Sequence, residues 1–559
     1  MPAICVLLCA LAGAFVWTLA LYELLSYSCF GLGFWEWLCI SIFSILSFKA
    51  TFDMLVSLCG FLCITFKCGP ARVLPAVPAD AEAGTAFGST NGKHEERQAI
   101  CAIVFFVRHE KRMVMEDSFS HVLAEMDDSL KKKVHIFIQS NSDDSTHLAE
   151  ERAVIEKYSR LFNVPCFHRR RSYPEFGIGK YAGFLDWITE FRSVYKYIVT
   201  LDADGYIAPS SIHRMIHFMD HNLNVGILQT FPKSLSMGSL YGDLLCYGSN
   251  AHAPFFLCGI NYLAGGCGCY WGHNAILRID SMKESLPNPR KVYPAWFTAL
   301  LPHRGIEILS HDPAEASVIC ANHHEVRATF DETIASYEHA PSHPLTGLLR
   351  DRRWLVGELL NVLLFCFNDR TRMFHRLTFT YGALNYVASL LLVIWTLIVL
   401  CFGLLDVVAL VGDQTVSLHT NIPVYLLSWL IFTLFFFKVL GAYRVFSKQK
   451  GSYGLWLLCL LDFVFLPLLT PCMCLYHSWY ILTAFGRKQV WDKTDREGNY
   501  GFLHVLKHAW HASLLGGVIL LFLAGNNWLG LFFFSCLTLT PVMFYIAGIR
   551  TKKLMIPNN

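Results

Sequence analysis

The sequence has little charge. Only 16% of its 559 residues are charged, and 46 basic residues nearly balance 43 acidic ones, which leaves a formal net charge of +3. Neither a nucleic-acid-binding surface nor a charged tail is therefore expected, and no nucleic-acid partner. With 54% hydrophobic residues and a mean hydropathy of +0.39, the chain is too apolar for a soluble protein and too long for one domain. These values predict a membrane protein with a soluble part.

The 20 cysteines would indicate a disulfide scaffold in a small secreted domain, which this chain is not. Many of them lie in apolar segments, where Cys behaves as a small hydrophobe, so we expect them to be reduced. One residue separates Cys267 from Cys269 in "GGCGCY", whereas zinc-binding pairs usually have about two to four residues between them. The pattern does not favour a metal site at this pair.

Two apolar segments, 4–25 and 38–66, open the chain and carry almost no charge. Each is long enough to cross a hydrocarbon core, which takes about 20 helical residues. The first lacks the basic leader of a signal peptide and the second follows it directly, so we expect two retained membrane helices within residues 1–68. A Pro/Ala/Gly-rich linker at 69–96 then leads to a more polar region.

A soluble domain is expected at 97–345, followed by an interfacial segment at 346–375. The C-terminal transmembrane bundle is expected at 376–550 and a cytoplasmic tail at 551–559. The bundle contains the apolar segments 376–405, 422–441, 454–485, 511–526 and 529–547.

The distribution of basic residues predicts the orientation. The loop at 406–421 has no Lys or Arg, whereas basic residues flank the other loops, and the positive-inside rule then places the soluble domain in the cytoplasm. The segment 454–485 has a basic loop on both sides and carries Pro467 and Pro471 in its middle. We interpret it as two short crossings, which gives eight spans in all.

Five β-rich segments of the soluble domain alternate with helical stretches and end in polar residues. They read "AICAIVFFVR", "KVHIFIQSN", "YKYIVTLDAD", "NVGILQTF" and "GIEILSHD". This alternation predicts a mostly parallel sheet with helices on both faces. Ligands of such sheets bind beyond the carboxyl ends of the strands, which is where Asp202 and Asp204 lie.

Two carboxylates in this arrangement suit Mg²⁺ or Mn²⁺ bridging a diphosphate, although Asp-Ala-Asp-Gly is also a good turn sequence. Asp312 follows another predicted strand and would act as a general base. The segment "LLRDRRW" supplies Arg350, Arg352, Arg353 and Trp354. Arginine suits diphosphate oxygens and an indole stacks under a sugar, while basic residues beside a membrane also meet anionic lipid.

Four segments in this order resemble the processive family 2 glycosyltransferases, and in particular the glucan glucosyltransferase H branch of osmoregulated periplasmic glucan biosynthesis. They are "LDAD" (201–204), "YWGHNAILR" (270–278), "ILSHD" (308–312) and "RDRRW" (350–354). The family pattern is an early Asp, a D-x-D, a catalytic Asp and Q-x-x-R-W, and this chain has Arg350 where Gln is usual. The resemblance implies a polytopic α-helical membrane protein with a cytoplasmic, A-type α/β glycosyltransferase domain that has a Rossmann-like, mostly parallel sheet.

The resemblance also implies residue roles. Asp204 would hold the metal, Asp202 would contact the nucleotide or its sugar, and Asp312 would be the base. The remaining donor-binding residues would be Lys180, Arg350, Arg353 and the early Asp, for which we choose Asp143 over Asp144. Trp354, His273 and Asn274 would bind the acceptor. A solvated lysine at a helix start and a core histidine are the alternatives for Lys180 and His273.

The implied activity is metal-dependent, inverting and processive transfer of glucose from UDP-glucose to a β-linked glucan. Resemblance to this branch implies that the linkage is β-1,2. UDP-N-acetylglucosamine is the second candidate donor. The implied setting is the bacterial inner (plasma) membrane, and the implied partners are the growing glucan, the lipid bilayer and periplasmic glucan-modifying or release proteins. Residues 485–498 fall where processive synthases carry a gating loop, although loops between spans normally carry charge. The alternatives are single-sugar transfer to a lipid acceptor, and an inactive membrane scaffold or sensor.

Overall fold

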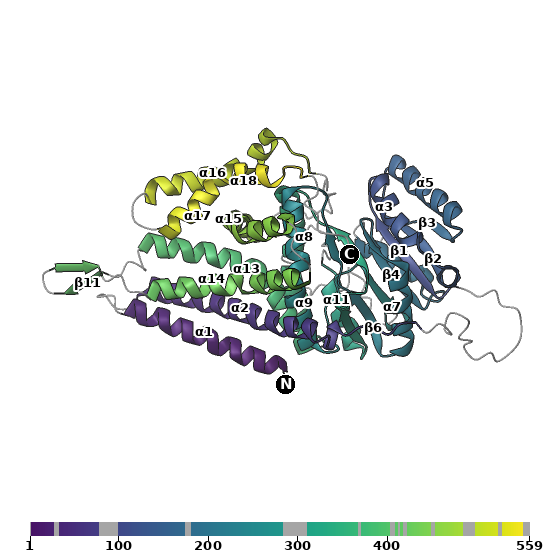
Figure 1. Cartoon of the computed structure of the whole chain (residues 1–559), viewed down its shortest axis with the longest axis horizontal. Helices are drawn as coiled ribbons and strands as arrows, with labels where there is room; N and C mark the ends of the chain where they lie inside the picture. The colour runs from purple at the N-terminus through teal and green to yellow at the C-terminus, as the bar shows by residue number, and fades with distance from the viewer. Residues whose placement is uncertain are drawn as a thin grey trace, which may run out of the picture.

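A computed structural model describes residues 2–26, 33–77, 99–173, 180–282, 310–366, 370–402, 408–411, 414–417, 422–448, 453–484, 498–523 and 528–551. A body of long helices lies beside a sheet domain (Figure 1). Most of the predicted strand at 305–312 and of the candidate gating loop at 485–498 lies outside the described residues.

The sheet domain contains a seven-stranded sheet in the order β3-β2-β1-β4-β8-β6-β9. β8 is antiparallel to both of its neighbours, and the other neighbouring pairs are parallel. The predicted, mostly parallel sheet is confirmed, and four of the five predicted segments contain its strands. The bounds are β1 Cys101–Val107, β2 Val134–Ser140, β3 Cys166–Arg170, β4 Tyr197–Asp202, β6 Val225–Thr230, β8 Ala275–Arg278 and β9 Glu325–Thr329.

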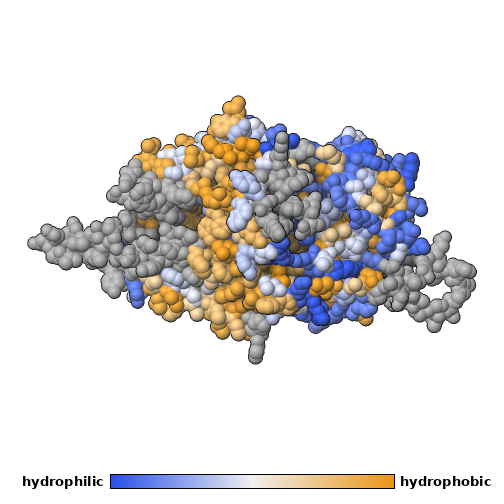
Figure 2. All heavy atoms as spheres, in the orientation of Figure 1, coloured by the Kyte–Doolittle hydropathy of each residue, from blue (hydrophilic) through white to orange (hydrophobic). Residues whose placement is uncertain are grey.

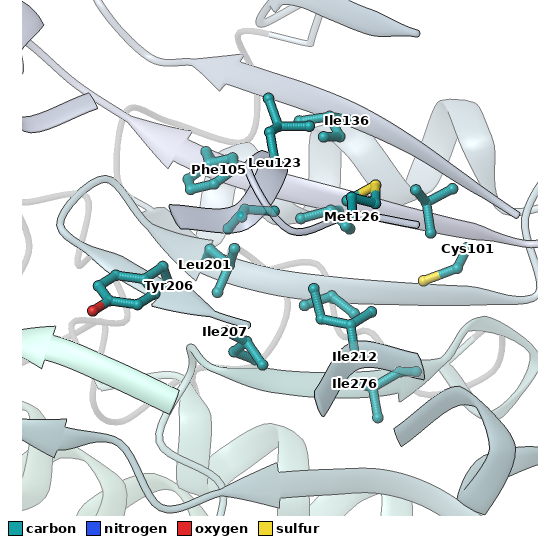
Figure 3. Close-up of a cluster of buried hydrophobic side chains, with 14 of the residues drawn as sticks. Cys101, Phe105, Leu123, Met126, Ile136, Leu201, Tyr206, Ile207, Ile212 and Ile276 are labelled. Carbon is teal, nitrogen blue, oxygen red and sulfur yellow. The ribbon is translucent and has the colours of Figure 1, made fainter. Parts of the chain in front are cut away.

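Helices cover both faces of this sheet, which is why its central strands are apolar along their length. All residues of β1 are buried, and Phe105 and Phe106 point into different hydrophobic clusters. Figure 3 shows the cluster around Phe105, with Leu123 and Ile136 beside it. This cluster draws on α3 (Arg112–Leu123), α5 (Ser145–Phe162) and α7 (Pro209–His221), and the other on α6 (Lys180–Phe191) and α11 (Asp312–Ala321).

Four helices among the described residues are long and apolar enough to cross a membrane: Ala3–Glu23, Phe34–Ala71, Met373–Val399 and Tyr453–Thr483. Hydrophobic residues gather over the helical body and hydrophilic ones over the sheet domain (Figure 2), which indicates a membrane protein. The helices of the body are α1 Pro2–Ser26, α2 Phe34–Thr65, α13 Met373–Phe402, α14 Ile422–Lys448, α15 Tyr453–Thr483, α16 Phe502–Leu523, α17 Trp528–Thr538 and α18 Thr540–Ala547. The hairpin of β11 (Val408–Val411) and β12 (Gln414–Ser417) lies at the end of this body opposite the sheet domain (Figure 1).

Three helices join the two parts: α8 (Leu240–Ala251), α9 (Ala253–Ala264) and α12 (Pro344–Phe365). α9 packs against α2 almost backbone to backbone. A Cβ atom on Gly60 would lie 1.8 Å from the Phe255 carbonyl oxygen, and one on Gly259 would lie 2.0 Å from that of Val56. Glycine is therefore required on both helices for the sheet domain to dock at this distance.

The segment at 454–485, expected to cross the membrane twice, forms one unbroken helix, α15, which includes Pro467 and Pro471. Its first turns pack on α8 and on the end of α14, where Lys448 pairs with Glu332 of the sheet domain. Its other end packs on α12, on the start of α13 and on Ala314 of α11. Both ends of α15 therefore adjoin the sheet domain, so the expected pair of crossings is wrong, and the basic loops on both sides need no second crossing.

Candidate functional site

Three parallel strands end at the same edge of the sheet. Val107 of β1 lies opposite Ser140 of β2, and Phe106 lies opposite Asp202 of β4. The buried part of β4 thus ends in a carboxylate that is 33% exposed, and Asp204 follows at 9%. Residues 203–204 form the turn that leads into β5 (Gly205–Ile207), so the turn interpretation and the binding interpretation of this sequence describe the same structure.

The backbone around the two aspartates is held from both sides. Ser118 Oγ donates to the Ala203 carbonyl at 2.9 Å, and His339 Nδ1 donates to the Asp204 carbonyl at 3.0 Å. Lys180, the first residue of α6, forms an ion pair with Asp202. Two residues predicted separately from the sequence are thus brought into contact.

A carboxylate that the sequence does not reveal lies beside this pair. Glu338 of β10 (Ser336–His339) is opposite Gly205 in an antiparallel pairing. Partial burial raises the pKa of Glu338, His273 and Arg350 oppose this shift, and the nearby Asp204 and Asp202 carboxylates add to it. The segment "SYEHA" carries no motif, so only the strand pairing brings Glu338 to the site.

The two predicted acceptor residues, His273 and Asn274, lie in one loop but have different surroundings. Asn274 is fully buried with φ at +52°. Its Nδ2 donates to Ser336 Oγ at 2.8 Å and to the Tyr337 carbonyl at 3.1 Å, which ties the loop to β10. His273 is 17% exposed, and its Nε2 lies 3.4 Å from Glu338 Oε2. His273 therefore lies next to the carboxylates, whereas Asn274 is buried and holds the loop against β10.

Asp312 is the first residue of α11 and lies against the same loop. Gly272 makes this approach feasible, because a Cβ atom there would lie 2.1 Å from Asp312 Oδ1. His311 Nε2 lies 3.1 Å from Asp312 Oδ1 and its Nδ1 lies 3.4 Å from Glu315 Oε2. Burial lowers the pKa of His311, but Asp312 and Glu315 outweigh this effect and leave it raised. The His311 ring therefore lies between the two carboxylates.

α12 holds the segment before Asp312 and carries the predicted arginines. Asn361 Nδ2 donates to the Ser310 carbonyl at 3.0 Å, and Ser310 Oγ donates to Glu358 Oε1 at 3.3 Å. Burial raises the pKa of Glu358 to about 7. The Arg350 guanidinium lies over the Trp354 ring, 4.5 Å from its centroid. Arg350, Trp354 and Glu358 are spaced four residues apart and share one face of α12; Arg353 lies on the same helix.

Asp143 forms a separate contact. It is 77% exposed and pairs with His109, which follows β1, and this hydrogen bond lowers the pKa of Asp143. The neighbouring Asp144 caps α5 by accepting from the Thr146 N–H at 3.3 Å. Asp144 thus has a structural function, and Asp143 is the one of the two that faces the edge where β1 and β2 end.

Comparison with known proteins identifies a family model and curated relatives that this chain resembles. Residues 111–286 match the model of glycosyl transferase family 2. The chain is 29% identical over 462 residues to glucans biosynthesis glucosyltransferase H of Nitrosomonas europaea, covering 76% of this chain and 51% of that protein. It is likewise 29% identical over 458 residues to the Escherichia coli K12 protein of the same name, covering 76% and 52%. The chain thus spans about half the length of these curated relatives, and the sequence resemblance to this branch is confirmed.

Among solved structures, the mannosyltransferase PcManGT of Pyrobaculum calidifontis, in complex with GDP-Man and Mn²⁺, matches with a TM-score of 0.41 and 9% identity. The match covers 80% of this chain and 99% of that one.

Proposed function

We propose that the chain, whose residues 111–286 match the model of glycosyl transferase family 2, is a membrane-embedded, inverting glucosyltransferase. It transfers glucose from UDP-glucose processively and so elongates a β-1,2-linked glucan. The observation that carries this proposal is that two groups of carboxylates adjoin one loop. Asp312 lies against Gly272 of this loop, and His273 of the same loop lies next to Glu338, which is near Asp202 and Asp204. A donor sugar and an acceptor hydroxyl can meet between these two groups of carboxylates.

On this proposal, the donor binds at the carboxyl ends of β1, β2 and β4. Asp143 contacts the base, and Asp202 with Lys180 contacts the nucleotide or its sugar. Arg350 and Arg353 bind the diphosphate, to which the guanidinium fork is suited. Arg350 is supported in this role by its influence on Glu338, which puts it near the D-x-D aspartates.

A divalent cation fits the same group of residues. Asp204, Asp202 and Glu338 are oxygen ligands of the kind that Mg²⁺ and Mn²⁺ prefer. The raised pKa of Glu338 includes repulsion from Asp204 and Asp202, which a bound cation would relieve. We assign the metal to Asp204, with Glu338 beside it. When bound, the cation would stabilise charge that develops on the diphosphate.

The acceptor hydroxyl attacks the anomeric carbon from the face opposite the diphosphate, and the bond from that carbon to the diphosphate oxygen breaks. Asp312 takes the hydroxyl proton. Because the acceptor displaces the diphosphate directly, no covalent enzyme intermediate forms. His311 and Gly272 fix the position of the Asp312 carboxylate. Trp354 stacks with the acceptor sugar, His273 lines its site, and Asn274 holds the loop that carries His273.

The helical body would embed this transferase in a membrane. We propose that it lies in the bacterial inner membrane with the sheet domain in the cytoplasm, divided as predicted from the sequence. The location of the β11–β12 hairpin at the end of the helices opposite the sheet domain supports this orientation. The growing glucan would pass through the helical body, residues 485–498 would gate the donor site, and periplasmic proteins would receive the product.

The proposal is tested with the full chain in detergent. UDP release from UDP-glucose is followed with Mg²⁺ or Mn²⁺, and the product is sized before and after β-1,2-specific glucanase. Asp312→Asn should lower kcat about 100- to 10,000-fold and leave donor binding intact. Asp204→Ala should abolish metal-dependent UDP binding.

The control is Asp128→Asn, because this side chain is 88% exposed on the short helix α4 (Asp128–Lys131). Near wild-type turnover of Asp312→Asn would refute the assignment of the base. Single-sugar products would refute processive synthesis, and a glucanase-resistant polymer would refute the β-1,2 linkage. A wild-type chain that uses no nucleotide sugar would favour the scaffold alternative.

A further inference from the structure

Three metal-binding side chains, two thiols and an imidazole, meet outside the group of carboxylates that the proposed reaction uses. The thiols of Cys267 and Cys320 and one ring nitrogen of His375 all lie within 4.8 Å of one another. They come from distant parts of the sequence: the turn after α9, the end of α11 and the first turn of α13. We propose that this Cys-Cys-His cluster binds a structural Zn²⁺ ion.

The distances suit zinc. In a tetrahedral site with Zn–S near 2.3 Å and Zn–N near 2.0 Å, ligand atoms are separated by about 3.3 to 3.8 Å. A contraction of about 1 Å, which side-chain torsions can supply, brings the three atoms into that range. Two thiolates and an imidazole are also the ligand types that select zinc over Mg²⁺ or Mn²⁺, so the site would not compete with the D-x-D aspartates for their ion.

The imidazole is a second and independent indication. His375 is 2% exposed, and its Nε2 is buried without a hydrogen-bond partner among the described residues. A buried polar atom without a hydrogen bond destabilises the folded state, and a bond to a metal would remove this cost. Cys320 is fully buried as well. Two of the three ligands are therefore buried, and Cys267 is partly exposed.

A cation lies next to the Cys267 thiol. Arg372 Nη1 donates to Cys267 Sγ at 3.6 Å. The thiolate is the form that ligates a metal.

Zinc here would act as a clamp between the two parts of the molecule. Cys320 lies at the end of the helix that Asp312 begins, and His375 lies at the start of α13 in the helical body. The ion would fix α11, and with it the Asp312 carboxylate, relative to that body. The sequence hides this site, because Cys269, the obvious partner of Cys267, is not in the cluster.

The test measures metal, and it is independent of the proposed reaction. The full chain, purified in detergent without chelator, is analysed by mass spectrometry for metal content, and about one zinc ion per chain is expected. Cys267→Ser, Cys320→Ser and His375→Ala should each lose most of it. Cys269→Ser, two residues away in the same turn, should keep it.

His375→Cys separates ligation from folding, because it replaces a nitrogen ligand with a sulfur ligand. It should retain zinc, and in the wild-type chain Co²⁺ exchanged for zinc should give thiolate-to-cobalt charge-transfer absorption. Three results would overturn the proposal: a zinc-free wild-type chain, a disulfide between Cys267 and Cys320 in the purified protein, or equal zinc in wild type and in all ligand variants.

Discussion

Gly272→Ala tests whether Asp312 lies against the 270–274 loop as the structure has it. The added Cβ would lie 2.1 Å from Asp312 Oδ1, whereas ordinary contact begins at 3.4 Å, so the carboxylate must withdraw by about 1.3 Å. A displacement of about 1 Å at a reacting group can cost about 100-fold in rate. We therefore expect kcat to fall about 100-fold.

A second cost of this substitution comes from the backbone. Gly272 has φ at +81°, a conformation that costs an L-residue about 1 to 2 kcal/mol. Gly265→Ala is the matched control, since Gly265 has φ at +60° and nothing within 4 Å of the position of its Cβ. Both variants place an alanine at a positive φ, but only Gly272→Ala displaces Asp312.

The assay is the initial rate of UDP release over a range of UDP-glucose concentrations, together with the thermal unfolding temperature. Both variants should unfold at lowered temperatures, and only Gly272→Ala should lose kcat, with KM for the donor little changed. If Gly272→Ala turned over like Gly265→Ala, the contact between Gly272 and Asp312 would have no bearing on transfer, and our placement of the base would be refuted.

Two further predictions concern groups around this site. Because burial raises the pKa of Glu358 from 4.5 to about 7, the folded chain holds a proton there that the unfolded chain has lost, so stability falls as pH rises between about 4.5 and 7. The loss is at most about 3 kcal/mol; Glu358→Gln should remove this slope from the thermal unfolding temperature, and an unchanged slope would contradict the assignment. Asp143→Ala should weaken UDP binding, measured by calorimetry, without changing stability. Asp144→Ala removes a helix cap, so it should lower the free energy of unfolding by about 1 kcal/mol and leave UDP affinity unchanged. The reverse result would show that Asp144, and not Asp143, contacts the base.

Local patterns in the sequence were sufficient for the strands and for the D-x-D turn. Periodicity and strand-end position predicted β4 and the exposure of Asp202, because a buried strand must be apolar and its polar end must reach solvent. The same reasoning could not find Glu338, since no local feature of "SYEHA" distinguishes a site carboxylate from a surface one. Its pairing with Gly205 is a contact between segments more than a hundred residues apart.

α15 shows the limit of composition as a guide to topology. Its length and hydropathy satisfy the criteria for a membrane span, and its two prolines favoured two crossings. The structure instead makes it one helix with both ends near the sheet domain. Which face an apolar helix buries depends on the helices that pack around it, and those contacts are not written in its own composition.

The sequence by itself determined the class of this protein: an apolar chain with a parallel-sheet domain between hydrophobic segments, and a set of motifs that resembles the family 2 glycosyltransferases. These properties follow from hydropathy, periodicity and residue order, which are local. Only the tertiary structure decided which side chains share a site. It set Lys180 on Asp202, Asp312 against Gly272, and Cys267 beside Cys320 and His375, because helix packing and strand register bring together residues that the sequence keeps apart.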